Sequence, residues 1–94
     1  MPPLSLLDFT SVSPGQTARD ALAASVTLAQ QAERLGYKRI WYAEHHNNAR
    51  IASSSPSVFI AHVATQTKHI RLGSGGIMLP NHSPLIVAEQ FSLL

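Results

Sequence analysis

The chain has 94 residues, of which 45% are apolar and 13% are charged, and its net charge is +2 with five histidines counted as neutral. The seven basic residues are scattered, so no run of Lys or Arg marks a surface for nucleic acid or for an anionic membrane. The chain contains no cysteine, which excludes disulfide and thiolate chemistry. It also has no apolar run long enough to span a bilayer and no secretory signal at its start. A soluble cytoplasmic protein is therefore expected.

The first half of the chain predicts a strand, a helix and a second strand. Residues 4–9, LSLLDF, form the first strand and lead into a turn-rich loop. Thr17 is a good helix N-cap, with Asp20 three residues later as the partner of a capping box, and Gly36 ends the helix. Residues 39–46, RIWYAEHH, form the second strand, which is apolar on both faces.

The second half repeats this order. Ser55 and Pro56 open a helix that runs to about Thr67, and residues 70–79 form a strand interrupted by glycines. The same Ser-Pro start, in NHSP, opens a last helix. Strands that are apolar on both faces and alternate with helices predict an α/β fold with a parallel sheet, either a (β/α)8 barrel or an open doubly wound sheet.

Function is expected where the strands end, because the carboxyl ends of parallel strands lie at one edge of the sheet. Phe9 ends the first strand, residues 44–46 (EHH) end the second and residues 73–76 (GSGG) end the third. We therefore expect Phe9, His45 and Gly75 to lie at one end of a three-stranded parallel sheet whose strands follow the chain order.

The tripeptide Glu44-His45-His46 has three candidate roles. Carboxylate and imidazole groups can bind zinc or iron, but adjacent residues of an extended segment point to opposite sides and cannot easily hold one ion. A hydrogen-bonded strand end and a catalytic group are supported equally by the spacing, and both are favoured over a metal site. No metal ligand is therefore predicted.

The glycines of residues 73–76 allow several interpretations. Backbone N–H groups of a glycine-rich loop can bind phosphate, but such a loop leads directly into a helix, and here IMLPNHSP intervenes. The alternatives are a bend in a strand or a bare stretch of backbone that approaches a flat ligand, and the second is favoured. His62, His69 and Glu89 occupy positions more typical of structural or surface residues.

Three motifs together resemble one family. WYAEHH, GSGGIMLPNHSP and AEQF, in this order and spacing, resemble the bacterial luciferase-like family of flavin-dependent monooxygenases, and within it a subgroup of uncharacterised luciferase-like oxidoreductases. The resemblance covers nearly the whole chain and selects the (β/α)8 barrel. It implies reduced FMN at the C-terminal mouth of the barrel, supplied by a separate NAD(P)H-dependent reductase, with O2 and a small organic substrate. Some relatives use the deazaflavin F420 for hydride transfer, and that cofactor is the less favoured alternative.

The resemblance also implies roles for individual residues. His45 is the acid/base candidate, because a neutral imidazole near the flavin suits proton transfer near neutral pH, and Glu44 and His46 orient it or shape the pocket. Gly75 and Gly76 are expected to form a non-proline cis peptide beneath the flavin ring. The cofactor-binding set implied by the motifs is Gly73, Ser74, Gly75, Gly76 and Glu89.

The length of the chain raises a further expectation. A full barrel has about 250 residues, so residues 1–94 supply three of its eight strands and are expected to be an incomplete barrel domain that ends within the third helix. The low charge also suggests a part that further protein covers. Open sheet edges invite self-association, so a homo-oligomer is expected, with weak or no FMN binding by these residues alone. A non-catalytic or flavin-storing relative is the alternative, and the substrate is not predicted.

Overall fold

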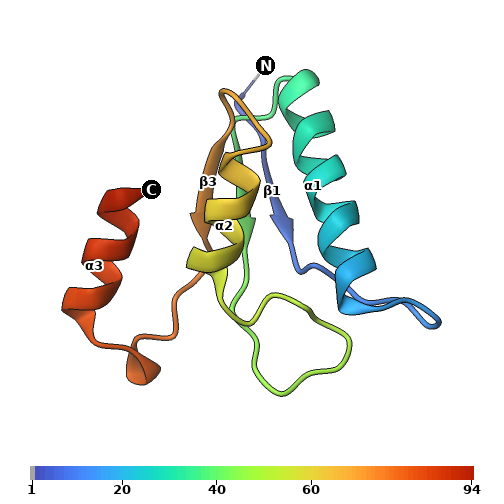
Figure 1. Ribbon diagram of the computed structural model, residues 1–94. Helices are drawn as coiled ribbons and strands as arrows, with labels where there is room; N and C mark the ends of the chain where they lie inside the picture. Colours follow the sequence, from blue (N-terminus) through green and yellow to red (C-terminus); the bar gives the residue numbers. More distant parts are fainter. Residues whose placement is uncertain (1) are drawn as a thin grey trace.

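The computed structural model describes residues 2–94, in which strands and helices alternate along the chain (Figure 1). In chain order the elements are β1 (Ser5–Asp8), α1 (Ala18–Arg34), β2 (Arg39–Tyr42), α2 (Pro56–Ala64), β3 (Arg71–Ser74), the 3-10 helix η1 (Leu79–Asn81) and α3 (Pro84–Leu93). None of the helices within residues 2–94 combines the length and the apolarity that crossing a bilayer requires.

The three strands form one parallel sheet in the order β1-β2-β3, which confirms the predicted α/β class and the predicted strand order. Ser5 of β1 pairs with Arg39 of β2, and Arg39 pairs with Arg71 of β3, so the strands start in register. Parallel neighbours need crossover connections, and α1 and α2 provide them. The chain is therefore three consecutive βα units of the kind that build a (β/α)8 barrel.

One face of the sheet carries the core. Ile40 and Tyr42 of β2 are fully buried, and they pack with buried side chains of α1 and α2, namely Ala29, Ala32, Phe59, Ile60 and Val63. Leu7 and Trp41 lie on the opposite face, where they are 52% and 37% exposed. Successive strand residues point to opposite faces, so this second apolar face is the one that a closed barrel turns inward.

Helix α1 begins as predicted. The Thr17 hydroxyl accepts a hydrogen bond from the Asp20 amide (3.2 Å), and the Asp20 carboxylate accepts one from the Thr17 amide (2.9 Å), which completes the capping box. Ser55 and Ser83 occupy the N-cap positions of α2 and α3, but within residues 2–94 neither side chain makes a capping hydrogen bond. These two helices begin with proline, which has no N–H to satisfy in the first turn.

The second strand is shorter than predicted. β2 ends at Tyr42 and not at residue 46, because the amide of His45 donates to the carbonyl of Ser53 (3.0 Å) and not to a neighbouring strand. The buried hydroxyl of Ser53 donates in turn to the carbonyl of Ala43 (2.6 Å). The EHH tripeptide therefore belongs to the loop that follows β2.

The third strand and the second helix are also shorter than predicted. β3 ends at Ser74 and not at residue 79. The amide of Gly75 makes the last hydrogen bond to β2, at the Tyr42 carbonyl, and the chain then leaves the sheet and enters η1. Helix α2 ends at Ala64 and not near Thr67, because the amides of the next two residues bond to carbonyls three residues back. Both changes lengthen the loops around the sheet and leave the order of elements as predicted.

A carboxylate on α1 holds the segment that leads into β3. Glu33 accepts hydrogen bonds from three successive backbone amides, those of Lys68 (2.8 Å), His69 and Ile70 (2.8 Å). These bonds, led by the one from the His69 amide, lower the pKa of the Glu33 carboxyl from its ordinary value. The contact joins the last turn of α1 to the start of β3. It lies at the N-terminal end of the strands, opposite to the end at which Phe9, His45 and Gly75 are found.

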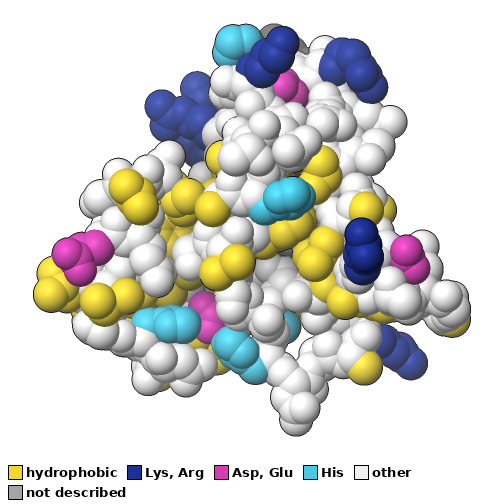
Figure 2. All heavy atoms as spheres, in the orientation of Figure 1, with side chains coloured by type: hydrophobic (Ala, Val, Ile, Leu, Met, Phe, Trp, Pro, Cys, Tyr) yellow, Lys and Arg dark blue, Asp and Glu magenta, His cyan; other side chains and the backbone are white. Residues whose placement is uncertain are grey.

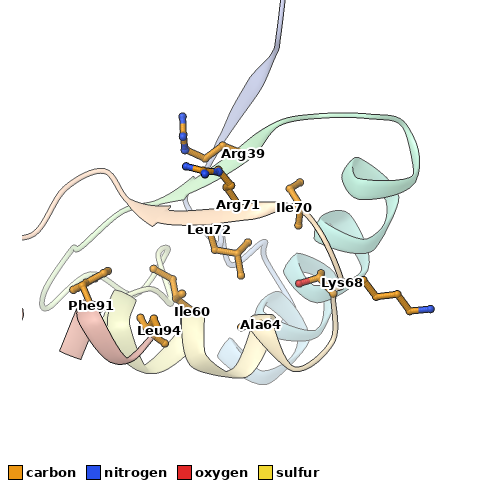
Figure 3. Close-up of a pocket in the computed structure, with 10 residues that line it drawn as sticks. Arg39, Ile60, Ala64, Lys68, Ile70, Arg71, Leu72, Phe91 and Leu94 are labelled. Atoms are coloured by element: carbon orange, nitrogen blue, oxygen red, sulfur yellow. The ribbon is translucent and has the colours of Figure 1, made fainter. Parts of the chain in front are cut away.

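The outer edge of β3 is only partly covered. A cavity of about 400 Å³ lies at this edge. Figure 3 shows Ile60 of α2, Leu72 of β3 and Phe91 of α3 around it. Helix α3 lies beside β3 and contributes no fully buried side chain within the described residues, and Leu85 is 68% exposed. This edge of the sheet therefore keeps accessible apolar surface.

Candidate active site

Three loops meet at the C-terminal end of the sheet. The ring centroid of His45, after β2, lies 5.6 Å from that of Phe9, after β1. The amide of Gly75, after β3, donates to the carbonyl of Tyr42 (2.7 Å). The prediction that Phe9, His45 and Gly75 share one end of the sheet is confirmed. Figure 2 shows histidine side chains beside an acidic side chain at the lower edge of the molecule, the end toward which the strands of Figure 1 run.

The loop after β1 is fixed to the loop after β2. Thr10 is buried with a positive φ of 50°, and its amide donates to the Asp8 carboxylate (2.8 Å). The Thr10 carbonyl accepts from the Ala52 amide (3.0 Å), and the Val12 amide donates to the Arg50 carbonyl (2.7 Å). These contacts hold the Phe9 ring in place beside the second loop.

Glu44 is the centre of a hydrogen-bonded group that we call the Glu44 cluster (Glu44, His46, Met78 and His82). Its Oε2 lies 2.6 Å from Nε2 of His46 and 2.9 Å from Nε2 of His82. Its Oε1 accepts from the Met78 amide (3.1 Å) and lies 3.1 Å from Nε2 of His82. The Glu44 side chain is 1% exposed, whereas the imidazoles of His46 and His82 are 45% and 37% exposed.

The Glu44 carboxyl is held in its ionised form. Burial disfavours the charge, but the hydrogen bonds from His46, His82 and the Met78 amide outweigh burial and lower the pKa of Glu44 to about 2. Because both imidazole Nε2 atoms are directed at the carboxylate, each must carry a hydrogen at Nε2 to donate. Residues 2–94 contain no group of three His, Cys, Asp or Glu side chains arranged to hold a metal ion. Through the hydrogen bonds of Glu44, the cluster links the loop after β2 to the loop after β3.

His45 points away from this cluster. Glu44 reaches toward the loop after β3, whereas the half-buried His45 ring lies against Phe9 after β1. Adjacent residues of an extended segment point to opposite sides, which explains why the structure separates the two. The backbone of His45 is tied to Ser53, so the ring is presented from a fixed main chain. Its role as an acid/base stays a prediction.

The glycines of the third loop differ in their surroundings. The Gly75–Gly76 peptide bond is cis, as the resemblance implied. A Cβ on Gly75 would lie 3.2 Å from Cβ of Trp41, whereas one on Gly76 would meet none of the described atoms within 4 Å. Gly73 faces the Trp41 indole, so at that position the neighbouring side chain leaves no room for a Cβ, and a role in cofactor binding stays a prediction. Open backbone is found at Gly75 and Gly76, which are both exposed.

The two remaining members of the predicted cofactor-binding set are Ser74 and Glu89. The hydroxyl of Ser74 donates to the carbonyl of Tyr42 (3.3 Å) and is half-buried. Glu89 is exposed on α3 and, in the part of the chain that the structure describes, shares no hydrogen bond or ion pair with the Glu44 cluster. The structure thus brings Glu44 and His46 together with the third loop and leaves Glu89 apart.

Sequence reasoning missed two members of the Glu44 cluster, His82 and Met78. The motif NHSP was interpreted as the start of a helix and as part of a family motif, and its histidine received no role. The available signal was position, because His82 follows the third strand and the loops after parallel strands share one edge of the sheet. Met78 contributes only its amide, which no side-chain pattern could have indicated.

Comparisons with known proteins agree with this architecture. A family model described as luciferase-like monooxygenase matches residues 3–94. An N-acetyl-S-alkylcysteine monooxygenase of Bacillus subtilis (strain 168) is 53% identical over 91 residues, which are 97% of this chain and 27% of that protein. The chain therefore spans about a quarter of the length of such relatives.

Two solved structures share the fold of the chain. The crystal structure of apo-MsnO8 superposes with a TM-score of 0.91 and 45% identity, over 95% of this chain and 27% of that one. The oxygenating constituent of the 3,6-diketocamphane monooxygenase from Pseudomonas putida, a type II Baeyer-Villiger enzyme in complex with FMN, gives a TM-score of 0.84 and 26% identity, over 94% and 24%. Together with the family match over nearly all described residues, these likenesses show that the chain belongs to the luciferase-like monooxygenase family.

Proposed function

We propose that the whole protein to which these residues belong is a flavin-dependent monooxygenase that uses reduced FMN and O2 to oxygenate a small organic substrate. The observation that carries the proposal is the position of a half-buried imidazole, His45, and a bare glycine turn, Gly75–Gly76, at the same end of the sheet. Membership of the family supports the reaction type, and the FMN complex of the Pseudomonas putida neighbour supports the cofactor.

The third loop fits a flat ring system. Gly75 and Gly76 are exposed, and the open space at the Gly76 Cα would be filled by the first atom of any side chain. Trp41 lies next to this turn and is 37% exposed on the face of the sheet that a barrel turns inward. Bare backbone beside an aromatic ring allows a planar ligand to approach closely, so we assign the turn of Gly75 and Gly76, with Ser74 before it, to the flavin.

A reduced flavin supplies the electron pair for O2, so that one oxygen atom enters the substrate and the other leaves as water. The residues of this chain would bind and orient the reactants and move protons. His45 would transfer a proton at a ring nitrogen, and the hydrogen bond from its amide to Ser53 and the packing of its ring against Phe9 support this role. Imidazole is the side chain best suited to transfer protons near neutral pH. Glu44 and His46 would not touch the reacting atoms in this proposal. Their hydrogen bonds within the Glu44 cluster would hold the loop that carries His45.

Several finer features belong to the same proposal. FMN is favoured over F420, with a separate NAD(P)H-dependent reductase as the source of the reduced flavin. A cytoplasmic location, a homo-oligomeric state and a contact from Glu89 to the cofactor are carried over from the resemblance. Residues 1–94 would form the first part of the barrel domain, and the substrate is left open.

Labelled dioxygen tests the proposal directly. The whole protein would be mixed with reduced FMN and a panel of aliphatic aldehydes under ¹⁸O2, and the products analysed by mass spectrometry. One ¹⁸O atom in the organic product, dependent on reduced FMN, is the expected result. Stoichiometric FMN binding without labelled product would instead identify a flavin-storing protein. Hydride transfer with reduced F420, and no label, would identify the deazaflavin alternative.

A further inference from the structure

The loop after β3 carries an imidazole that the reaction proposed above does not assign. His82 lies between η1 and α3, 38 residues after Glu44, and its Nε2 is within hydrogen-bond distance of both carboxylate oxygens of Glu44. We propose that His82 is a positioning residue of the flavin site, which acts through Glu44 to hold the loop after β3 against the loop that carries His45. The inference rests on the proposed function, since these two loops are the ones assigned to the flavin and to proton transfer.

In the hydrogen bond between His82 and Glu44, the carboxylate is buried and the imidazole is partly exposed. Loss of the hydrogen bond would therefore destabilise the buried carboxylate. A carboxylate that is 1% exposed is stable only when hydrogen-bond donors replace the water around it. Within residues 2–94 its donors are His46 from its own loop, and the Met78 amide and His82 from the loop after β3. Hydrogen bonds to an ionised group are stronger than those between neutral groups. Removal of the His82 ring would therefore leave Glu44 short of a donor and weaken the link between the loops.

The geometry shows what this link fixes. The loop after β3 is attached at three points: Gly75 to the Tyr42 carbonyl, and Met78 and His82 to Glu44. The first point carries the glycine turn, and Glu44 directly precedes His45. A shift of the second or third attachment would move the turn relative to the His45 ring. Because catalysis depends on near-ångström placement of the reacting groups, such a shift would slow the reaction more than it weakens binding.

The proposal requires a donor at position 82 and not an imidazole as such. Glutamine can donate an amide N–H to the Glu44 carboxylate, whereas alanine cannot donate at all. The His82 side chain is 37% exposed, so its removal leaves no cavity in the core around Ile40 and Tyr42. The titratable side chains that contact Glu44 are His46 and His82 themselves, so no third described charge within hydrogen-bond distance can substitute for the lost donor.

The experiment compares His82→Ala, His82→Gln and the control His62→Ala in the whole protein. His62 is exposed on α2 and its ring contacts Phe59, outside the Glu44 cluster. Two quantities are measured: kcat for ¹⁸O incorporation, and the dissociation constant for FMN from its fluorescence. We expect His82→Ala to lower kcat about 10²-fold with a much smaller change in FMN affinity, and His82→Gln to restore most of the loss. His62→Ala should match the wild type.

A double-variant cycle tests that His82 acts through Glu44. Groups in direct contact give non-additive effects, so His82→Ala should cost little further in a Glu44→Gln background. The proposal is overturned if His82→Ala behaves like His62→Ala, if glutamine is no better than alanine, or if the two losses simply multiply. Failure of the proposed function gives a different result, because the wild type itself would then incorporate no label.

Discussion

The indole ring of Trp41 lies against Gly73, its partner in the register of β2 and β3. A Cβ on Gly73 would lie 2.6 Å from Cζ3 and 2.8 Å from Cε3 of the ring, closer than atoms of neighbouring residues approach. The guanidinium carbon of Arg39 lies 5.0 Å from the centre of the same ring, on the same face of the sheet. The indole ring is thus packed between the guanidinium of Arg39 and the backbone of Gly73, where there is no room for a side chain.

Gly73→Ala is expected to destabilise the fold by about 1–3 kcal/mol, the usual range for an overpacked contact. The clash is with the indole of Trp41, so the same substitution should cost clearly less in a Trp41→Leu background. Urea denaturation of the four proteins of this cycle measures the free energies of unfolding. Equal costs in both backgrounds would show that Trp41 does not set the requirement for glycine.

His45→Ala should lower substrate oxygenation by the whole protein about 10²-fold or more, the usual scale for a lost acid/base. Binding of FMN should change much less, because the glycine turn and not the imidazole is assigned to the flavin ring. Turnover at saturating reduced FMN is the measurement, with His69→Ala as control, since His69 is exposed and precedes β3 at the opposite end of the sheet. Unchanged turnover in His45→Ala would exclude it as the acid/base.

The Glu44 carboxyl should make stability depend on pH in the acid range. Its pKa in the folded chain is about 2, below the ordinary value of 4.5, so the folded state binds the proton more weakly than the unfolded state. The stabilisation is therefore fully present above about pH 4.5 and is lost as the pH falls toward 2. Glu44→Gln should flatten this part of the stability curve. If the free energy of unfolding of Glu44→Gln falls with pH as steeply as that of the wild type, Glu44 is not the ionised, hydrogen-bonded carboxylate described here.

Glu33→Gln should lower stability and weaken the join between α1 and β3. The neutral amide keeps one acceptor oxygen in place of the two that bind three amides, so bonds to Lys68, His69 and Ile70 are lost or weakened. Hydrogen exchange at these three amides should accelerate in the variant. Glu89→Gln, on the exposed surface of α3, is the matched control and should leave both stability and exchange unchanged.

Residues 1–94 on their own should self-associate and bind FMN weakly or not at all. Leu7 and Trp41 are exposed on one face of the sheet, and β1 and β3 each have an edge without a partner strand among the described residues. Burial of apolar surface contributes about 25 cal/mol per Å² to the free energy of association. A second copy of the chain that covers this face, or pairs with an open edge, is therefore expected to bind. Sedimentation at micromolar concentration, with and without FMN, is the test. A compact monomer that holds FMN stoichiometrically would contradict both statements.

The sequence predicted the elements and their order, because alternating apolar segments and turn residues are local signals. Thr17 and Asp20 illustrate this, since their spacing alone indicated the capping box that the structure contains. Strand ends were predicted less well. β2 was extended to residue 46, because the pattern could not show that the His45 amide would leave the sheet for Ser53.

The candidate site was predicted in part. Glu44 and His46 were expected near a functional strand end, and the structure joins them through a hydrogen bond of 2.6 Å. His82 was missed because its partner lies 38 residues earlier in the chain, and no local pattern encodes such a contact. The contact between Gly73 and Trp41 of the neighbouring strand could not be predicted, because it joins residues 32 positions apart, and the role of Gly73 in cofactor binding stays a prediction.

The Glu33 contact also closes a long loop of the chain. The Ile70 amide that its carboxylate binds comes 37 residues later. Closure of a loop of this length costs conformational entropy, so the contact contributes to stability only when α1 and β3 are both held by the rest of the fold. Contacts between segments far apart in the chain also slow folding, and the parallel pairing of the three strands consists of such contacts.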